Sequence, residues 1–548
     1  MFLPHPAQSF LPLNNPLGFG AADLIELALA ALLVAFALAW RPWLEPYAAG
    51  LAQKPGWCML LLAALPVALR LLLLPHHPIP VPDIYDEFSH LLVADTLRHF
   101  RLANPAHPFH QFFETFFVLQ EPTYSSIYPA GQGAALAIGW IIWGTPWAGV
   151  VLTVAALCAL CYWMLRGWTT PGWALAGGLL AVMEFGPLNQ WMNSYWGGAL
   201  PAAAGCLVFG ALPRLRRGPR RRDAVLLGAG LAIHLLTRPY ESIFLLFGVI
   251  LYFLPAWRSA TKPSLAAALV VLPAIGLTLL QNKQVTGSWT TLPYTLSQYQ
   301  YGVPAALTFQ AHPAPHRELT REQDLDYKMQ LSFRGERAET IGSYLLRLAY
   351  RFRYYRFFFM PPLYLALPFF FVALRDPRLA WVMVFPLIFA LGVNFFPAFQ
   401  YHYMAAVTCL FVLAGVTGLQ QLARFNALAA RIVVLLCIAQ FALEYGLHAF
   451  SDNPWSLALR NPERRVAVNN QLTRAPGKQL VFVRYWPRHI FQDEWVYNAA
   501  DIDGARVVWA RDLGAAEDDK LRRYYPDRTA WLLEPDARPP RLTAYMGQ

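Results

Sequence analysis

Three carboxylates stand close together directly after an apolar stretch of the chain: Asp83, Asp86 and Glu87. A carboxylate that enters hydrocarbon costs roughly 2.5–3.5 kcal/mol on insertion scales, so acids at the end of an apolar segment need a reason. An ionised carboxylate can take the proton of an attacking hydroxyl group, which is general-base chemistry. We therefore expect a reaction here, with Asp86 as the base and Glu87 supporting it or orienting the acceptor.

The residues that follow predict the element that positions these acids. Apolar side chains recur at helical spacing over 86–97, which indicates a helix lying along the membrane surface. Asp86 and Glu87 fall in its first turn, where backbone N–H groups favour negative charge. Adjacent helical residues point about 100° apart, so the two acids should differ in role, and Asp83 is a reserve base. The alternative is that the acids only cap the helix.

The composition is that of an integral membrane protein. Hydrophobic residues make up 56% of the chain and charged residues 14%. A helix needs about 20 apolar residues to cross about 30 Å of hydrocarbon, and the long apolar runs predict a mostly α, polytopic bundle of about twelve spans. We expect 131–143 to be a re-entrant or surface helix, and the cysteines, all in apolar runs, to pack as small hydrophobes. The expected spans are 22–40, 57–74, 145–165, 171–188, 197–213, 223–237, 241–256, 264–281, 357–374, 379–396, 400–420 and 430–448.

The positive charge indicates which loops face the cytoplasm. The formal net charge is +11, but Lys and Arg concentrate in short loops, which is typical of membrane orientation and not of nucleic-acid binding. The loop 213–222 holds six arginines and is the strongest cytoplasmic marker. The opposite, outer face should then receive the candidate segments 75–130, 189–198, 237–241, 282–356 and 397–403, and the tail.

The tail changes composition near Ser451, where charge increases and the long apolar runs end. We therefore divide the chain into a membrane domain, 1–449, with two large outer loops, and a small soluble α/β domain, 450–548, on the outer face. The strands expected in this domain are 479–485, 506–510 and 529–533, and the expected helices are near 461–472 and 515–523.

These features together resemble the GT-C superfamily of polytopic glycosyltransferases, which includes protein O-mannosyltransferases and the lipid A aminoarabinose transferase. The resemblance lies in Asp86-Glu87 opening the first large outer loop, the surface helix after it, the stretch from Glu121-Pro122 through Gly144, the many spans and the outer C-terminal domain. The chain departs from the pattern in an additional span before the acids. It also carries Asn193 where some relatives place an acid.

The resemblance implies a membrane glycosyltransferase in a bacterial inner membrane, with its active site facing the periplasm. Such enzymes take a sugar from a polyprenyl-phosphate donor and pass it to a glycan, lipid or protein acceptor, usually with inversion. Any cofactor stays undetermined, and a divalent cation is an open alternative. The outer segments also hold polar and aromatic groups typical of carbohydrate sites. We expect the sugar or the acceptor to contact Asp83, Glu121, Tyr128, Asn193, Tyr195, Glu241 and Tyr403.

A lipid-phosphate leaving group requires cations on the outer face. Arg351, Arg353 and Arg356 precede the span at 357–374 against the positive-inside tendency, which a bound phosphate would explain. Snorkelling at the interface is the alternative for this cluster. Arg238 is a further candidate, although it is also spaced to pair with Glu241. His402 lies at the start of an outer-facing span and is the last candidate for the phosphate.

Two other classes of protein stay open on the sequence. A transporter of a lipid or sugar would place ionisable groups midway through its helices, whereas these acids cluster at one surface. A ligase or polymerase of the O-antigen type would use Arg and His in a large outer loop, and the loop 282–356 keeps that class open.

Overall fold

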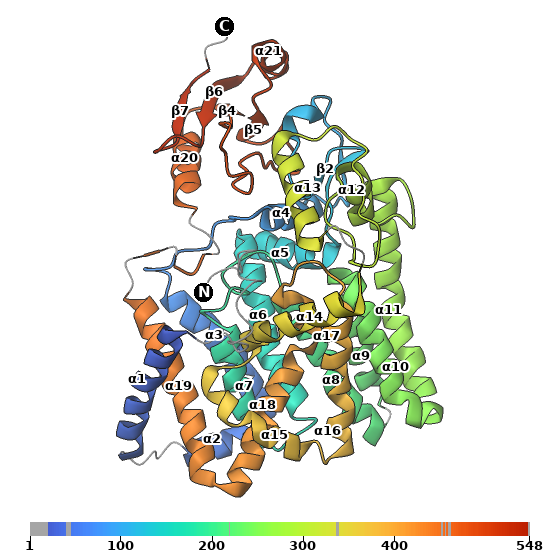
Figure 1. The fold of residues 1–548 in the computed structure, drawn as a ribbon, viewed down its shortest axis with the longest axis vertical. Coiled ribbons are helices and arrows are strands. Elements are labelled where there is room, and N and C mark those ends of the chain that lie inside the picture. Colours follow the sequence, from blue (N-terminus) through green and yellow to red (C-terminus); the bar gives the residue numbers. More distant parts are fainter. Residues whose placement is uncertain are drawn as a thin grey trace.

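A computed structural model of the chain describes residues 20–39, 45–218, 220–335, 339–450, 453–454, 456–458 and 462–545. The molecule is elongated, with a helical bundle at one end and a sheet of C-terminal strands at the other (Figure 1). The helices of the bundle are α1 (Ala21–Ala39), α2 (Glu45–Ala52), α3 (Pro55–Leu72), α6 (Pro146–Leu165), α7 (Pro171–Phe185), α8 (Ala199–Arg217), α9 (Arg221–Thr237), α10 (Pro239–Phe253), α11 (Trp257–Thr286), α15 (Leu367–Ala373), α16 (Pro377–Val382), α17 (Val384–Val393), α18 (Thr408–Phe425) and α19 (Ala427–Ala449).

Among the described residues, fewer helices than expected are long and apolar enough to be membrane spans. In the part of the chain that the structure describes, five helical segments are long and apolar enough to cross a membrane, or six if a bent pair counts as one. Helices α7 and α10 have 15 residues each. Fifteen residues rise only about 22 Å, less than the hydrocarbon thickness. The chain is a multi-pass membrane protein, but the expected twelve spans are not confirmed.

Two of the expected spans are broken. The segment 357–374 contains the short 3₁₀ helix η5 (Pro361–Leu365) before α15, and the segment 379–396 is divided between α16 and α17. A bend of 114° lies between these two expected spans, after α15. Prolines at 361, 362, 377 and 386 explain these interruptions, because proline fits the first turn of a helix and disrupts its interior. The stretch 131–143 does form a short helix, α5 (Ala130–Trp143), which packs against α6.

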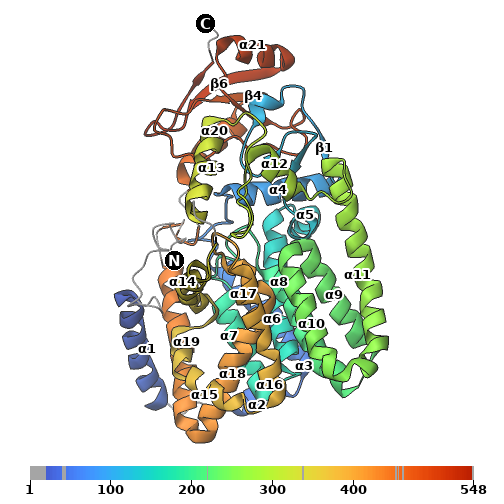
Figure 2. The same cartoon turned by 45° about the vertical axis from the view of Figure 1, so that its right-hand side comes forward.

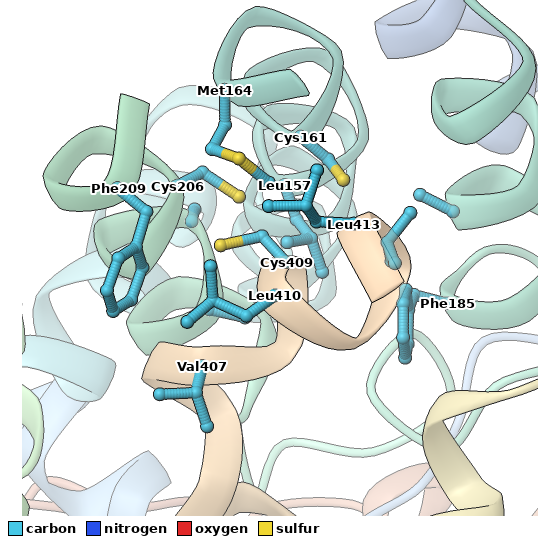
Figure 3. Close-up of a cluster of buried hydrophobic side chains, with 14 of the residues drawn as sticks. Leu157, Cys161, Met164, Phe185, Cys206, Phe209, Val407, Cys409, Leu410 and Leu413 are labelled. Carbon is cyan, nitrogen blue, oxygen red and sulfur yellow. The ribbon is translucent and has the colours of Figure 1, made fainter. Parts of the chain in front are cut away.

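The centre of the bundle is packed with sulfur-containing and aliphatic side chains. Figure 3 shows Cys161 and Met164 of α6, Cys206 of α8 and Cys409 of α18 meeting in one buried cluster. All six cysteines are buried and free, so their expected role as small hydrophobes is confirmed.

One glycine allows a close approach between α8 and a neighbouring 3₁₀ helix. A Cβ atom at Gly205 of α8 would lie 1.8 Å from the carbonyl oxygen of Ala406. Ala406 belongs to the 3₁₀ helix η6 (Tyr401–Val407), which carries His402 and Tyr403. Only a residue without a side chain lets η6 rest on α8 at this point.

A second layer covers one end of the bundle (Figure 2). It contains three short antiparallel strands in the order β1 (Asn104–Pro105), β3 (Thr123–Ser126) and β2 (Val118–Leu119). The expected surface helix is α4 (Tyr85–Arg98), and it lies in this layer with α12 (Pro293–Tyr301) and α13 (Arg321–Arg334). The helix α14 (Ile341–Arg351) and the 3₁₀ helix η4 (Phe352–Phe358) lead from the layer back into the bundle.

The C-terminal strands form the third layer. Strands β5 (Val507–Arg511), β4 (Lys478–Val483) and β6 (Arg528–Glu534) are parallel, and β7 (Arg541–Ala544) adds antiparallel to β6. Helices α20 (Glu463–Arg474) and α21 (Ala515–Tyr524) complete the unit. The expected strands and helices of the tail are therefore confirmed, and β7 is the element that the sequence reading missed. The boundary at 449–450 stays a prediction.

A buried ion-pair cluster joins the third layer to the second. The guanidinium of Arg511 lies 2.6 Å from a carboxylate oxygen of Glu322 in α13 and 2.6 Å from one of Glu494. Its Nε also donates to the backbone oxygen of Glu114 at 2.9 Å. Beside it, Phe112 and Phe113 share one core with Phe482 of the C-terminal sheet. The C-terminal unit is thus docked on the segments that surround α4.

The backbone contact at Gly205 gives the first prediction. Gly205→Leu should destabilise the protein by about 1–3 kcal/mol or more, because the new side chain has to displace backbone atoms of η6. The matched control is Gly276→Leu in α11, where an added Cβ meets nothing within 4 Å. The thermal midpoints of the two purified variants measure the difference, and equal midpoints would contradict the proposed packing.

Candidate active site

Glu87 fixes the start of α4. Its Oε2 accepts hydrogen bonds from the backbone N–H groups of Asp83 and Ile84 at 2.9 and 3.2 Å. Its Oε1 accepts from the backbone N–H of Tyr195 at 2.8 Å. The side chain therefore closes the first turn of the helix and ties that turn to the loop between α7 and α8. Helix capping, the alternative raised for the acids, describes Glu87 well.

Asp86 lies one residue earlier and faces a different set of groups. It is 8% exposed, and its Oδ1 accepts a short hydrogen bond from the hydroxyl of Tyr128. Burial raises the pKa of Asp86 to about 6, against the opposing hydrogen bonds of Tyr128 and Trp196 and the charge of Arg238. A carboxyl group with a pKa in this range is ionised at neutral pH yet accepts a proton more readily than an exposed aspartate.

His90 follows Asp86 by one helical turn and lies against the same tyrosine. The rings of His90 and Tyr128 stack with their centroids 4.1 Å apart. His90 is 7% exposed, and its Nδ1 has no hydrogen-bond partner within the described part of the chain. Burial lowers its pKa to about 3, so the imidazole is neutral. The sequence reading missed this residue, although its i, i+4 spacing from Asp86 places both on one helix face.

The opposite wall of the site comes from the bundle. Arg238 precedes α10, lies 5.3 Å from the ring centre of Tyr403 and is 3.9 Å from Glu241. The positive charge of Arg238 also lowers the pKa of Asp86. The structure therefore brings the predicted residues Asp86, Tyr128, Arg238, Glu241 and Tyr403 into one neighbourhood.

Three aromatic or imidazole side chains complete this wall. The rings of Trp196 and His402 meet edge to face with centroids 5.0 Å apart, and Trp196 hydrogen-bonds Asp86. Tyr294 of α12 lies within electrostatic reach of Arg238 and Asp86. His402 was predicted from the sequence. Tyr294 was not, because aromatic residues near a membrane surface are too common to stand out.

The expected arginine cluster does not form one group. Arg351 donates to the backbone oxygens of Val393 at 2.9 Å and Phe396 at 2.5 Å, and so holds the turn that leads into η6. The Nε of Arg353 donates to the backbone oxygen of Tyr350 at 2.8 Å. The guanidinium of Arg356 reaches α1, where it lies 3.5 Å from Asp23. The three side chains have different partners: Arg351 ends α14 and contacts the turn before η6, Arg353 contacts the last turn of α14, and Arg356 contacts α1.

Three of the predicted sugar contacts make structural contacts in the protein. Asn193 accepts from Arg70 Nε at 2.7 Å and donates to two backbone oxygens of its own loop. The hydroxyl of Tyr195 donates to the backbone oxygen of Pro80 at 2.8 Å. Glu121 lies 2.9 Å from Arg317 in the second layer. Asp83 contributes its backbone N–H to the bond with Glu87.

In the residues that the structure describes, no three His, Cys, Asp or Glu side chains are grouped closely enough to hold an ion.

Sequence comparison finds no similar protein, whereas structure comparison finds solved structures with a similar fold. No family model matches the chain, and no curated protein matches it in sequence. ArnT from Cupriavidus metallidurans in the apo state matches with a TM-score of 0.50 and 13% identity, over 87% of this chain and 93% of that chain. The same ArnT bound to undecaprenyl phosphate gives a TM-score of 0.49, with 13% identity over 88% and 93%.

A further match is the archaeal oligosaccharyltransferase AglB from Archaeoglobus fulgidus, in complex with an inhibitory peptide and a dolichol-phosphate. Its TM-score is 0.43 and its identity 10%, over 90% of this chain and 70% of that chain. ArnT and AglB are both GT-C glycosyltransferases. The match to apo ArnT, at a TM-score of 0.50, confirms the likeness to the GT-C fold, and at 13% identity it shows the fold alone.

The different surroundings of Asp86 and Glu87 predict different responses to neutralisation. Glu87→Gln should lower the thermal midpoint at pH 8, because the amide NH₂ cannot accept the backbone hydrogen bonds, and each unmade bond costs about 1–3 kcal/mol. Asp86→Asn keeps an acceptor for Tyr128 and removes a buried charge, so its midpoint should equal or exceed that of the parent protein. An equal decrease in the thermal midpoint of the two variants would contradict the capping role of Glu87 and the buried, non-capping position of Asp86.

Proposed function

We propose that the chain is a membrane glycosyltransferase that moves a sugar from a polyprenyl-phosphate donor to a glycan, lipid or protein acceptor. The observation that carries the proposal is the placement of Asp86, a buried carboxylate with a pKa of about 6 that lies beside the cation Arg238. This pair sits where the bundle meets the second layer, in a chain with the fold of ArnT. A base and a cation at a membrane surface match the needs of sugar transfer from a lipid phosphate.

The proposed reaction is a single displacement. The acceptor hydroxyl attacks the anomeric carbon of the donor, and Asp86 accepts the hydroxyl proton as the new bond forms. The bond between that carbon and the phosphate oxygen breaks, and the polyprenyl phosphate leaves with the electron pair. Attack from the side opposite the phosphate inverts the configuration of the anomeric carbon.

The charge that develops on the leaving phosphate requires a cation on that side of the sugar. Arg238 is the first candidate, because its charge already acts on Asp86 and its pairing with Glu241 is long. His402 adds a second group from η6. Arg351, Arg353 and Arg356 stay candidates for the lipid chain or its phosphate, ranked lower because the contacts of Arg351 and Arg356 described above are structural.

The remaining residues have supporting roles in this proposal. Tyr128, Glu241 and Tyr403 line the neighbourhood of Asp86 and are proposed to contact the sugar or the acceptor. Asp83, Glu121, Asn193 and Tyr195 are proposed to act through the loops that they hold. We further propose that the site faces the periplasm from a bacterial inner membrane, since the six arginines of 213–222 lie around the junction of α8 and α9, at the far end of α8.

Asp86→Asn tests the general base. Transfer from a panel of polyprenyl-phosphate sugars in membranes should fall by about 10²–10⁴-fold, the usual contribution of such a group. The matched control is Asp518→Asn, which neutralises another buried acid, in the C-terminal unit, whose pKa is also raised, to about 7. That variant should keep most of its activity. Full transfer by a folded Asp86→Asn protein would exclude the mechanism.

The pH dependence of the parent enzyme follows from the same group. A base works only when deprotonated, and burial raises the pKa of Asp86 to about 6. The value of kcat/KM should therefore rise with pH through about 6 and level off above 7. A rate that stays constant from pH 5 to pH 8 would contradict the assignment of Asp86.

Arg238→Gln tests the donor cation. Loss of a charge-assisted contact to phosphate should weaken the binding of a polyprenyl phosphate about tenfold or more. Arg356→Gln tests the lower-ranked candidate in parallel, because it removes the same charge from the contact with Asp23. If Arg356→Gln weakens binding and Arg238→Gln does not, the phosphate lies on the α1 side of the bundle.

A further inference from the structure

A polar cavity lies at the C-terminal end of α8, away from the candidate active site. It has a volume of about 340 Å³ and opens where α6 and α8 end and α9 begins. This volume lies within the range of small-ligand sites, which is roughly 300–1,000 Å³. Its lining includes Trp163, Arg214, Arg217, Arg220 and Arg222, with Asp223 as the one acid among the lining residues. Four guanidinium groups facing one carboxylate leave a strong positive charge.

Part of this cavity is rigidly built. Arg214 donates to the backbone oxygens of Gly210 at 2.5 Å and Trp163 at 2.8 Å, and its guanidinium stacks 4.1 Å from the ring centre of Trp163. Arg217 donates to the backbone oxygen of Gly167 at 2.9 Å. Arginines that serve only to keep a loop on the cytoplasmic side of the membrane need no such fixed positions. These are held against the ends of two helices with further N–H groups left to bind a ligand.

The beginning of α9 adds to the attraction for an anion. Its N-cap residue, Arg220, supplies no side-chain hydrogen bond to the first turn. The first N–H groups of a helix have no partner within the helix, and the helix dipole makes this end positive. A phosphate group is the ligand that such an end and a set of arginines bind together.

The position of the cavity along α8 indicates that the phosphate belongs to a membrane lipid. Helix α8 follows the loop that holds Glu87 through Tyr195, and its 19 residues rise about 28 Å to the cavity, close to the thickness of a bilayer core. The cavity therefore lies near the membrane surface opposite the one that carries α4. Basic pockets between helices at that level are suited to lipid head groups, with Trp163 at the interface.

We propose that this cavity binds the phosphate of an anionic phospholipid head group. The site is separate from the donor site and does not depend on the proposed transfer reaction. By bridging the ends of α8 and α9, the lipid would fasten together the two helices whose other ends lead to Trp196 and to Arg238.

Lipid titration of the purified full-length protein tests the proposal. The probe is dioleoyl phosphatidylglycerol, with dioleoyl phosphatidylcholine and inorganic phosphate as comparisons, and native mass spectrometry counts the bound lipids. Arg217→Gln/Arg222→Gln should weaken phosphatidylglycerol binding at least fivefold. Both side chains are exposed, so the variant should fold. The control Arg375→Gln/Arg424→Gln removes the same charge from loops expected on the same membrane face and should leave binding unchanged.

Three outcomes would overturn the proposal. Equal losses in the two double variants would mean that the surface charge attracts lipid without a site. Equal binding of phosphatidylcholine would remove the requirement for an anionic head group. Displacement of phosphatidylglycerol by an equal concentration of inorganic phosphate would assign the cavity to a free anion. If the double variant misfolds, the single variant Arg222→Gln should still weaken binding at least twofold, and unchanged binding there also contradicts the proposal.

Discussion

Burial of the Asp86 carboxylate is the constraint on which the arrangement of the site depends. Removing a charge from water is unfavourable unless hydrogen bonds and an opposite charge offset the cost. Here the offsets come from distant parts of the chain: Tyr128 from the turn before α5, Trp196 from the turn before α8, and Arg238 from the turn before α10. The site exists only when all three segments meet at the first turn of α4. The balance between burial and these partners leaves the pKa of Asp86 near neutrality.

Several contacts outside the proposed chemistry fix the positions of these three segments relative to one another. Glu87 joins α4 to the turn before α8, and Arg351 holds the backbone that leads into η6. Gly205 lets η6 rest on α8. In the second and third layers, Arg511 docks the C-terminal sheet on the segments around α4, where removal of one partner of a buried ion pair typically costs about 3–5 kcal/mol. The C-terminal unit therefore supports the wall of the site.

The sequence predicted the parts that depend on local pattern. The helix that begins near Asp86 and the strands of the tail follow from periodicity and composition. The outer location of Tyr128, Arg238, His402 and Tyr403 stays a prediction. The broken spans after Met360 were missed because hydropathy ignores what a proline does within an apolar run. The carbonyl contacts of Arg351 depend on a turn more than 40 residues later in the chain. No spacing rule reports such a contact, and the same holds for the bond between Glu87 and Tyr195.

A structure of the protein with a bound polyprenyl phosphate tests the central claim most directly. The claim is that the acid at the start of α4 and the cation at the start of α10 face one donor. Density for the phosphate should lie within hydrogen-bond reach of Arg238, with the sugar side of the phosphate open toward Asp86. A phosphate bound beside Arg356 and α1, with Asp86 and Arg238 facing no part of the lipid, would contradict the account.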